Sequence, residues 1–349
     1  MKQKQEFMKE VNKHNFLSRL DNFANKVDIS STLIIESNIN FIPKITIAIP
    51  TYKRAHFLKE AVDSAINQIS FDDYEIIVID NDSNRNCESE RLINSYNNSR
   101  LSYYKNTENI GMYGNWNRCI TLSKGDYITI LNDDDTLEEN YLSQINYFLQ
   151  RMGDVHALLV RFNYIDSNSI ITSNANKYNK KIKRVLLLEL FWGNINPGSL
   201  GILFSKEQML KVGGFDESYF PSSDYEFLVN YIANFDNVFT INQYLANYRL
   251  AVNESQKLIT LNNFIKKDNS IRKSFINFFP KIKILIESAI PVIKYNQYKT
   301  LSNTSLDFYQ DNINKISSLY KTITFKNRLS LKIIYLILMF FKKFKFMIK

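Results

Sequence analysis

The sequence ITIAIPTYKR, residues 45–54, decides the fold, because it is a short β-branched run that is stopped at Pro50. Two more apolar runs of strand length follow it, EIIVI at 75–79 and YITIL at 127–131. Between these runs, apolar residues recur at helical spacing. Runs without polar alternation are typical of strands covered on both faces. Strands that alternate with helices predict an α/β fold, with a mostly parallel, doubly wound sheet and flanking helices.

Three segments are expected along the chain. They are an N-terminal extension at 1–43, an α/β domain at 44–255 with halves at 44–150 and 151–255, and a helix-rich C-terminal region at 256–349. The extension has apolar residues at roughly helical spacing from Phe7 to Leu20, which favours a helix. Strand and helix alternate clearly in the first half of the domain and less clearly in the second.

The distribution of charge and of cysteine excludes several classes of protein. The 349 residues include 44 Lys and Arg against 35 Asp and Glu, a net charge of +9. Nine basic and no acidic residues follow Asp311, so the rest of the chain is neutral and a diffuse nucleic-acid-binding surface is not expected. Two cysteines, Cys87 and Cys119, exclude a disulfide framework, and three scattered histidines exclude a zinc cluster. A reducing, cytoplasmic environment is predicted.

Polar loops follow the predicted strands. Open α/β sheets bind ligands at the carboxyl ends of their strands, where loops 50–54, 80–83, 109–111 and 132–135 are expected. A dinucleotide-dependent oxidoreductase needs glycines after the first strand, so that the backbone can approach a pyrophosphate. That position holds Pro-Thr-Tyr, which excludes such an enzyme.

Asp133, Asp134 and Asp135 form the sharpest chemical feature of the sequence. Three carboxylates at the mouth of an apolar strand repel one another, and burial would increase that repulsion. A divalent cation such as Mg²⁺ or Mn²⁺, held by one or two carboxylates together with phosphate oxygens, would remove the conflict. The alternative is a solvated loop and helix cap, which Asp also favours.

Several single residues near these loops could contact a nucleotide. Asn81 could accept the imide N–H of uracil or thymine, or could form an Asx turn. Tyr52 could stack on a base, or could be a half-buried aromatic residue. Arg54 or Arg118 could contact a diphosphate, or could be ordinary surface cations.

Taken together, these motifs resemble the glycosyltransferase family 2 pattern. The resemblance runs from ITIAIPTYKRAHFLKEAVDSAINQ through YEIIVIDNDS to YYKNTENIGMYGNWNRCITLSKGDYITILNDDDTLEENYL, over residues 45–142. GSLGILFSKEQMLKVGGFDESYFPSSDYEFLVNYI, residues 198–232, looks like the acceptor-side region of that family. The resemblance implies a GT-A fold and an inverting, metal-dependent transfer of a sugar from a nucleotide-diphospho-sugar.

The resemblance also implies roles for individual residues. It assigns the nucleotide sugar to Pro50, Thr51, Tyr52, Asn81 and Asp133, the divalent metal to Asp134 with Asp135 adjacent, and the catalytic base to Asp224. Asp224 could instead cap a helix, in which case Glu226 is the nearby substitute. Asn81 stands where many members have Asp, which leaves uracil and thymine as favoured bases without excluding guanine. No His follows Tyr248 and Arg249, so water and diphosphate are expected to complete the metal shell.

The basic tail predicts contact with a membrane surface. Residues 333–341 are nine consecutive uncharged apolar or aromatic residues, followed by KKFKFMIK. A spanning helix needs about 20 such residues, so this stretch is expected to lie along an anionic inner leaflet or to dock on the core. A peripheral position on the cytoplasmic membrane would suit a lipid-linked glycan acceptor, as in bacterial capsule or O-antigen assembly.

Two other classes of function stay open. A nucleotidyltransferase also places carboxylates and a metal beside a nucleotide, although the Gly-rich, basic loop that it favours is absent. A non-catalytic member that binds a nucleotide sugar within a membrane complex would be expected to lack Asp224 or the triplet, and both are present.

Overall fold

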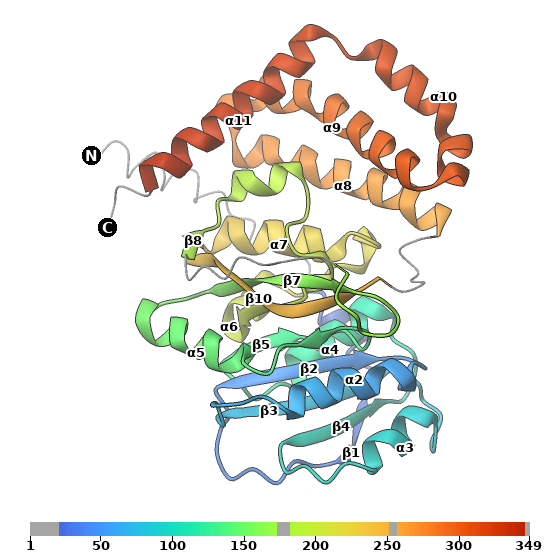
Figure 1. The fold of residues 1–349 in the computed structure, drawn as a ribbon, viewed down its shortest axis with the longest axis vertical. Coiled ribbons are helices and arrows are strands. Elements are labelled where there is room, and N and C mark those ends of the chain that lie inside the picture. The colour runs from blue at the N-terminus through green and yellow to red at the C-terminus, as the bar shows by residue number, and fades with distance from the viewer. Residues whose placement is uncertain (1–20, 173–181, 251–256, 346–349) are drawn as a thin grey trace.

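The structure is a computed structural model of the chain and describes residues 21–172, 182–250 and 257–345. Figure 1 shows the sheet domain with β1 at one end and the helices α8 to α11 stacked at the other. The helix expected from Phe7 to Leu20 lies outside the described residues.

The strands form one ten-stranded mixed sheet in the order β1-β4-β3-β2-β5-β9-β7-β10-β6, with β8 paired to β10. The strands are β1 (Ser31–Ile35), β2 (Ile45–Thr51), β3 (Tyr74–Asp80), β4 (Leu101–Asn106), β5 (Tyr127–Ile130), β6 (Thr136–Leu137), β7 (Ala157–Ile165), β8 (Ile182–Arg184), β9 (Ile202–Ser205) and β10 (Val238–Arg249).

The first half of the domain has the predicted parallel, doubly covered arrangement. Strand β2 pairs in parallel with β3 and β5, and β3 pairs in parallel with β4. All residues of β2 and β3 are buried. Ile45, Ile47 and Ile49 belong to one apolar cluster, and Ala48 belongs to the other. Successive side chains therefore point to opposite, equally covered faces, as the apolar runs predicted.

Helices cover both faces of this sheet. The helices of the domain are α2 (Ala55–Ile66), α3 (Glu88–Asn94), α4 (Met112–Leu122), α5 (Tyr141–Met152), α6 (Lys206–Val212) and α7 (Ser223–Asn234). Apolar residues of α2, α3 and α5 share one cluster, and those of α4, α6 and α7 share the other. The α/β class is confirmed.

The second half of the sheet departs from the parallel order. Strand β9 lies antiparallel to both β5 and β7, whereas β10 is parallel to β7 and antiparallel to β6 and β8. A parallel neighbour requires a crossover connection. The described chain between β7 and β9 instead forms β8 and 3₁₀ helices at Leu187–Trp192 and Pro197–Ser199, so β9 returns antiparallel. The sheet is therefore mixed rather than mostly parallel.

The described part of the N-terminal extension adds an edge strand. A 3₁₀ helix, Ala24–Lys26, precedes β1, and β1 pairs antiparallel with β4, with Ser31 opposite Asn106. Because this pairing joins segments 75 residues apart, local periodicity does not reveal it.

The C-terminal region is helical, as predicted. It comprises α8 (Leu258–Phe278), α9 (Lys283–Thr304), α10 (Leu306–Thr322) and α11 (Phe325–Lys345). Phe275 and Ile334 belong to the same apolar cluster as Phe227 of α7, so α8 and α11 share a core with the sheet domain. Among the described helices, none has the length and the apolar content needed to cross a membrane.

Candidate active site

A cleft of about 710 Å³ lies at the carboxyl ends of β2, β3 and β5. The polar loops after these strands meet there, and segments far apart in the sequence complete the walls. The cleft is lined by Pro50, Thr51, Tyr52, Arg54, Asn81, Asn109, Gly111, Met112, Tyr113, Asn115, Trp116, residues 132–135, Asn194, Gly198, Phe220, Pro221, Ser222, Asp224, Tyr225, Tyr248, Thr260, Phe264 and Asp268. Its walls therefore come from both halves of the domain and from α8.

Asp133 is tied to the loop that follows β2. It accepts hydrogen bonds from the Thr51 hydroxyl at 2.8 Å and from the Arg54 guanidinium at 3.1 Å. Burial, offset in part by the Arg54 charge, raises the pKa of Asp133 to about 6. Pro50 and Tyr52 line the cleft beside it, and Tyr52 is 42% exposed, so its ring is accessible at the rim.

Asp134 and Asp133 converge on one cationic group. Arg54 donates through Nη2 to Asp134 at 2.8 Å and through Nη1 to Asp133 at 3.1 Å. Two carboxylates that share a guanidinium are close enough to share a divalent cation, and carboxylate oxygens are the ligands that Mg²⁺ and Mn²⁺ prefer. The donor set therefore fits a metal held by these two side chains. In the described residues, no group of three or more His, Cys, Asp or Glu side chains is arranged to hold one.

Asp135 has a different environment from its two neighbours. Its Oδ1 accepts the Arg249 backbone N–H at 2.9 Å, and its Oδ2 accepts the Asn132 side-chain amide at 2.8 Å. It is 1% exposed, and burial raises its pKa well above the usual range for Asp. Arg249 also donates to the Asp134 carbonyl oxygen at 2.8 Å. Asp135 thus joins the loop to β10, and its predicted role as a metal ligand does not fit these contacts.

The Asn81 side chain is fully engaged within the protein. Its Oδ1 accepts from Asn106 at 3.1 Å and from the Ile110 backbone N–H at 2.9 Å. Its Nδ2 donates to Asn109 at 2.7 Å and to the Gly111 carbonyl oxygen at 3.1 Å. The Ile110 N–H fixes which amide atom is the oxygen. Asn81 therefore positions the loop before α4, and its predicted hydrogen bond to a base would require breaking one of these contacts.

Arg118 lies away from the cleft. Its guanidinium donates to the backbone carbonyl oxygens of Lys26, at 3.0 Å, and of Ile29. Because Arg118 projects from α4 toward the N-terminal segment before β1, it anchors that segment, and the structure does not bring it to the donor site.

Asp224 begins α7 and faces the same cleft as the aspartate loop. Its Oδ2 accepts from the Asn194 side chain at 2.7 Å and from the Gly198 N–H at 2.9 Å. Burial raises the pKa of Asp224 to about 6; backbone hydrogen bonds from Gly198 and Tyr225 partly offset this effect, and the negative charge of Asp268 adds to it. A carboxylate with a raised pKa that remains ionised at neutral pH suits a general base.

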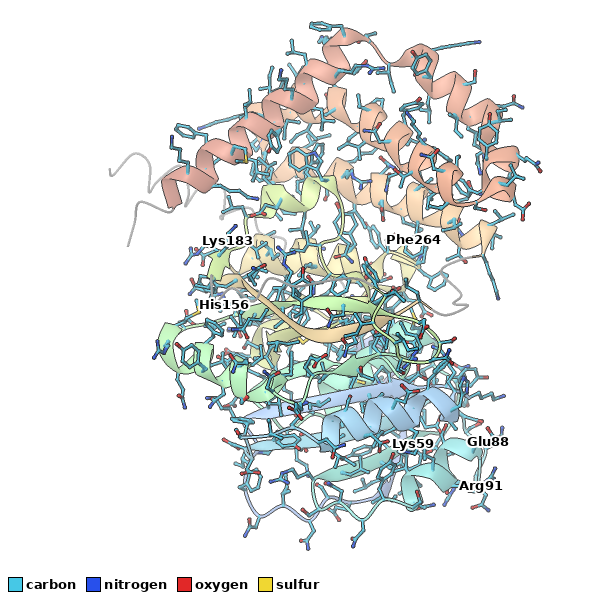
Figure 2. The ribbon with its side chains drawn as sticks, viewed as in Figure 1. Lys59, Glu88, Arg91, His156, Lys183 and Phe264 are labelled. Carbon is cyan, nitrogen blue, oxygen red and sulfur yellow. The ribbon has the colours of Figure 1, made fainter. Side chains whose placement is uncertain are left out.

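Asn194, Gly198 and α8 line the cleft although no sequence motif predicts that they do. Asn194 and Gly198 lie in an irregular segment without periodicity, so no local signal indicated their position beside Asp224. Thr260, Phe264 and Asp268 recur at helical spacing on α8, and Figure 2 shows Phe264 on the side of this helix that faces the sheet domain. Polar and aromatic residues on one face of a helix that packs against the sheet domain were the sequence feature that could have indicated a role for α8 in the site.

Solved structures share this fold. S. aureus TarS in complex with UDP-GlcNAc superposes with a TM-score of 0.55 at 16% identity, covering 67% of each chain. The mannosyltransferase PcManGT from Pyrobaculum calidifontis, in complex with GDP-Man and Mn²⁺, superposes with a TM-score of 0.51 at 16% identity, covering 86% of this chain and 87% of that one. The chain therefore has a fold of the GT-A type.

Sequence comparison finds similarity to one family of glycosyltransferases. Residues 46–205 match the model of Glycosyl transferase family 2. An uncharacterized glycosyltransferase of Methanocaldococcus jannaschii is 29% identical over 60% of this chain and 71% of its own length. The abequosyltransferase RfbV of Salmonella typhimurium is 32% identical over 32% of this chain and 34% of its own length.

Proposed function

We propose that this glycosyltransferase moves a sugar from a nucleotide-diphospho-sugar to an acceptor hydroxyl with inversion, in the assembly of a surface polysaccharide. The observation that carries the proposal is that one cleft is lined both by Asp133 and Asp134, in the loop after β5, and by Asp224, in the first turn of α7. The names of solved relatives that bind UDP-GlcNAc and GDP-Man support a nucleotide-sugar donor, and an abequosyltransferase among the sequence relatives supports a role in polysaccharide synthesis.

In this proposal, residues on one side of the cleft bind the donor, and a residue on the other side acts as the base. Asp133, held by Thr51 and Arg54, accepts hydroxyl groups of the donor. Asp224 takes the proton of the acceptor hydroxyl as this attacks the anomeric carbon, while Asn194 and the Gly198 N–H fix the carboxylate. One base and one displacement give inversion at the anomeric carbon.

A divalent metal is part of the proposal. Asp134, with Asp133 beside it, would hold Mn²⁺ or Mg²⁺, which as a Lewis acid would stabilise the negative charge of the departing nucleoside diphosphate. A cation held there would compete with the Arg54 guanidinium for both carboxylates, and Arg54 would then be able to contact the donor diphosphate, which is the role expected for it from sequence.

Donor recognition is tested by thermal unfolding of the full chain with UDP, dTDP or GDP, each with and without Mn²⁺. We expect UDP or dTDP to raise the melting temperature only when Mn²⁺ is present, because metal and diphosphate complete each other's coordination. GDP serves as the comparison for base preference. If no nucleotide stabilises the chain in a metal-dependent way, the proposed donor site is wrong.

Activity should fall in mild acid. The base must be ionised, and the raised pKa of Asp224 lies at about 6, so transfer at saturating donor should rise through that pH. At pH 5 the rate is expected to be about tenfold below its plateau, because about a tenth of the carboxylate is then ionised. The measurement is turnover between pH 4.5 and 8 with donor affinity followed at each pH, and a constant turnover between pH 5 and 7 would contradict the assignment.

The tail is proposed to contact an anionic membrane, which would bring the enzyme to a lipid-linked glycan on the cytoplasmic leaflet. Ile334 and Leu338 of α11 are buried against the core, yet Leu336, Met339 and Phe340 are 55%, 43% and 53% exposed. Exposed lysines, at positions 332 and 343, flank this apolar stripe. Apolar side chains with flanking cations suit a helix that lies at a lipid surface.

The double substitution Leu336→Glu and Phe340→Glu should weaken binding to phosphatidylglycerol-containing vesicles by at least about tenfold, because each large apolar side chain contributes roughly 1.5–3 kcal/mol when buried. Sedimentation with vesicles measures the effect, and pure phosphatidylcholine vesicles test the charge requirement. Ile284→Glu is the matched control, since Ile284 on α9 is 70% exposed but outside the stripe. Unchanged sedimentation of the double variant would rule out this surface.

A further inference from the structure

The cleft continues past Asp224 to a wall made by α8, beyond residues 46–205 that match the family. Phe264 and Asp268 of α8 lie on this wall, and Phe220, from the loop before α7, lines the cleft on the α/β side. This part of the cleft is the side on which an acceptor must approach if Asp224 is the base.

The Asp268 carboxylate is held in place and retains capacity to accept hydrogen bonds. Its Oδ1 accepts from the Ser222 hydroxyl at 2.7 Å, and its Oδ2 accepts from the Gln297 amide at 2.8 Å. Arg272 lies 3.8 Å from Oδ2. Each carboxylate oxygen can accept more than one hydrogen bond, so both can also accept from hydroxyl groups in the cleft. The orientation of the Asp268 carboxylate is fixed by Ser222, which caps α7, and by partners on α8 and α9.

Two phenyl rings lie near this carboxylate. Phe220 is 43% exposed although it lines the cleft, and its ring packs edge-on against Tyr113 at 6.4 Å. Phe264 projects from α8 toward the sheet domain (Figure 2). Aromatic rings that line a cleft beside hydrogen-bond acceptors suit a ligand that has both an apolar face and hydroxyl groups.

The negative charge of this wall further restricts the chemical class of ligand that can bind there. Asp224 and Asp268 interact electrostatically within the cleft, since the charge of Asp268 helps to raise the pKa of Asp224. Two carboxylates disfavour a phosphate or a uronate directly beside the base, because like charges in a partly buried site repel. An uncharged sugar ring has the hydroxyl groups and the apolar face that the wall can bind.

We propose that Phe264 and Asp268 of α8, together with Phe220 from the loop before α7, form the acceptor subsite and bind a neutral sugar ring, so that any phosphate of the acceptor lies outside this wall. The inference rests on the proposed function, because it takes Asp224 as the base. The C-terminal helical region then helps to select the acceptor, whereas the first half of the α/β domain selects the donor.

Saturation-transfer NMR on the full chain with UDP and Mn²⁺ tests the subsite. The probes are the methyl glycosides of glucose, galactose, mannose and N-acetylglucosamine, with glycerol 3-phosphate as the anionic comparison. We expect at least one glycoside to bind the wild-type chain and glycerol 3-phosphate to bind less well. Binding of none of the glycosides, or preferred binding of glycerol 3-phosphate, would overturn the proposal.

Variants of α8 residues test whether glycoside binding depends on this helix. Phe264→Ala and Asp268→Asn should each weaken glycoside binding by about tenfold, the effect of losing one ring contact or one charged hydrogen-bond acceptor, while Phe264→Trp retains it. Phe325→Ala and Asp307→Asn are matched controls, because both residues are exposed on helices away from the cleft. UDP affinity should be unchanged throughout.

The outcomes separate this inference from the proposed function. Metal-dependent UDP binding with wild-type glycoside affinity in both α8 variants would refute the subsite and leave the donor site standing. Loss of UDP binding by the wild-type chain would refute the donor site itself. If Asp268→Asn lowers the melting temperature, glycoside binding by Phe264→Leu becomes the test of the subsite. This variant keeps the apolar bulk of the side chain and removes only the aromatic face.

Discussion

Replacing Asp224 by Asn is expected to lower the rate of sugar transfer by about 10²–10⁴-fold, the usual contribution of a positioned general base. The amide has the same shape but cannot take a proton from the acceptor hydroxyl. It can still accept the Asn194 and Gly198 hydrogen bonds through its oxygen, so the local structure should persist. Turnover is measured by nucleotide release and by product mass, and donor affinity is measured separately by calorimetry.

Asp216→Asn is the matched control for this change. Asp216 accepts the Ser218 N–H at 2.9 Å in a nearby turn and does not line the cleft. The control should retain its turnover, and the Asp224 variant should retain its donor affinity. Wild-type turnover in the Asp224 variant would leave this residue with a structural role only, and Glu226→Gln would then be the next variant to measure.

Replacing Asp134 by Ala should remove the effect of Mn²⁺ on nucleotide binding. Asp133 and Asp134 both pair with the Arg54 guanidinium, so loss of Asp134 leaves one carboxylate of this pair for a cation. We expect the affinity for the nucleotide in Mn²⁺ to fall by more than about 100-fold, since changes to outer-shell partners alone cost 10- to 100-fold. Calorimetric titration of UDP with and without Mn²⁺ measures the change.

Asp135→Asn gives the informative comparison. Its carboxylate holds the Arg249 N–H and the Asn132 amide, so the substitution should lower the melting temperature by about a few degrees while the Mn²⁺ effect persists. The opposite pattern, with Mn²⁺ dependence kept in the Asp134 variant and lost in the Asp135 variant, would return the metal to Asp135.

Local sequence pattern was sufficient to predict the strands and helices in the first half of the α/β domain. Strands β2 and β3 are continuous apolar runs, and their burial on both faces follows from composition alone. The edge strand β1 was missed because its alternation is weak and its partner, β4, lies far along the chain. The antiparallel return of β9 was also missed, because direction depends on a connection that has no helical period.

In the candidate site too, some features could be predicted from sequence and others depend on contacts between distant segments. Asp133, Asp134 and Thr51 reach one cleft, as expected from segments at the ends of neighbouring strands, and Asp224 reaches the same cleft from the first turn of α7. Asp135 is the same residue type as Asp134 and adjacent to it, yet the backbone of β10, 114 residues away, occupies its carboxylate. Arg118 similarly turns to backbone carbonyls of the N-terminal segment, about 90 positions earlier in the chain, which no motif indicates.

The sequence by itself determined the α/β class, the order of the first strands, the positions of the acidic loops and the basic, apolar tail. These features depend on residue type and local spacing, which the unfolded chain already carries. Only the tertiary structure decided which aspartates stay open to a ligand, how Asn81 is used, and that α8 closes the cleft with Phe264 and Asp268. Each of those outcomes depends on which distant backbone or side-chain group contacts a given polar side chain. Tertiary packing decides that contact, and local sequence pattern does not.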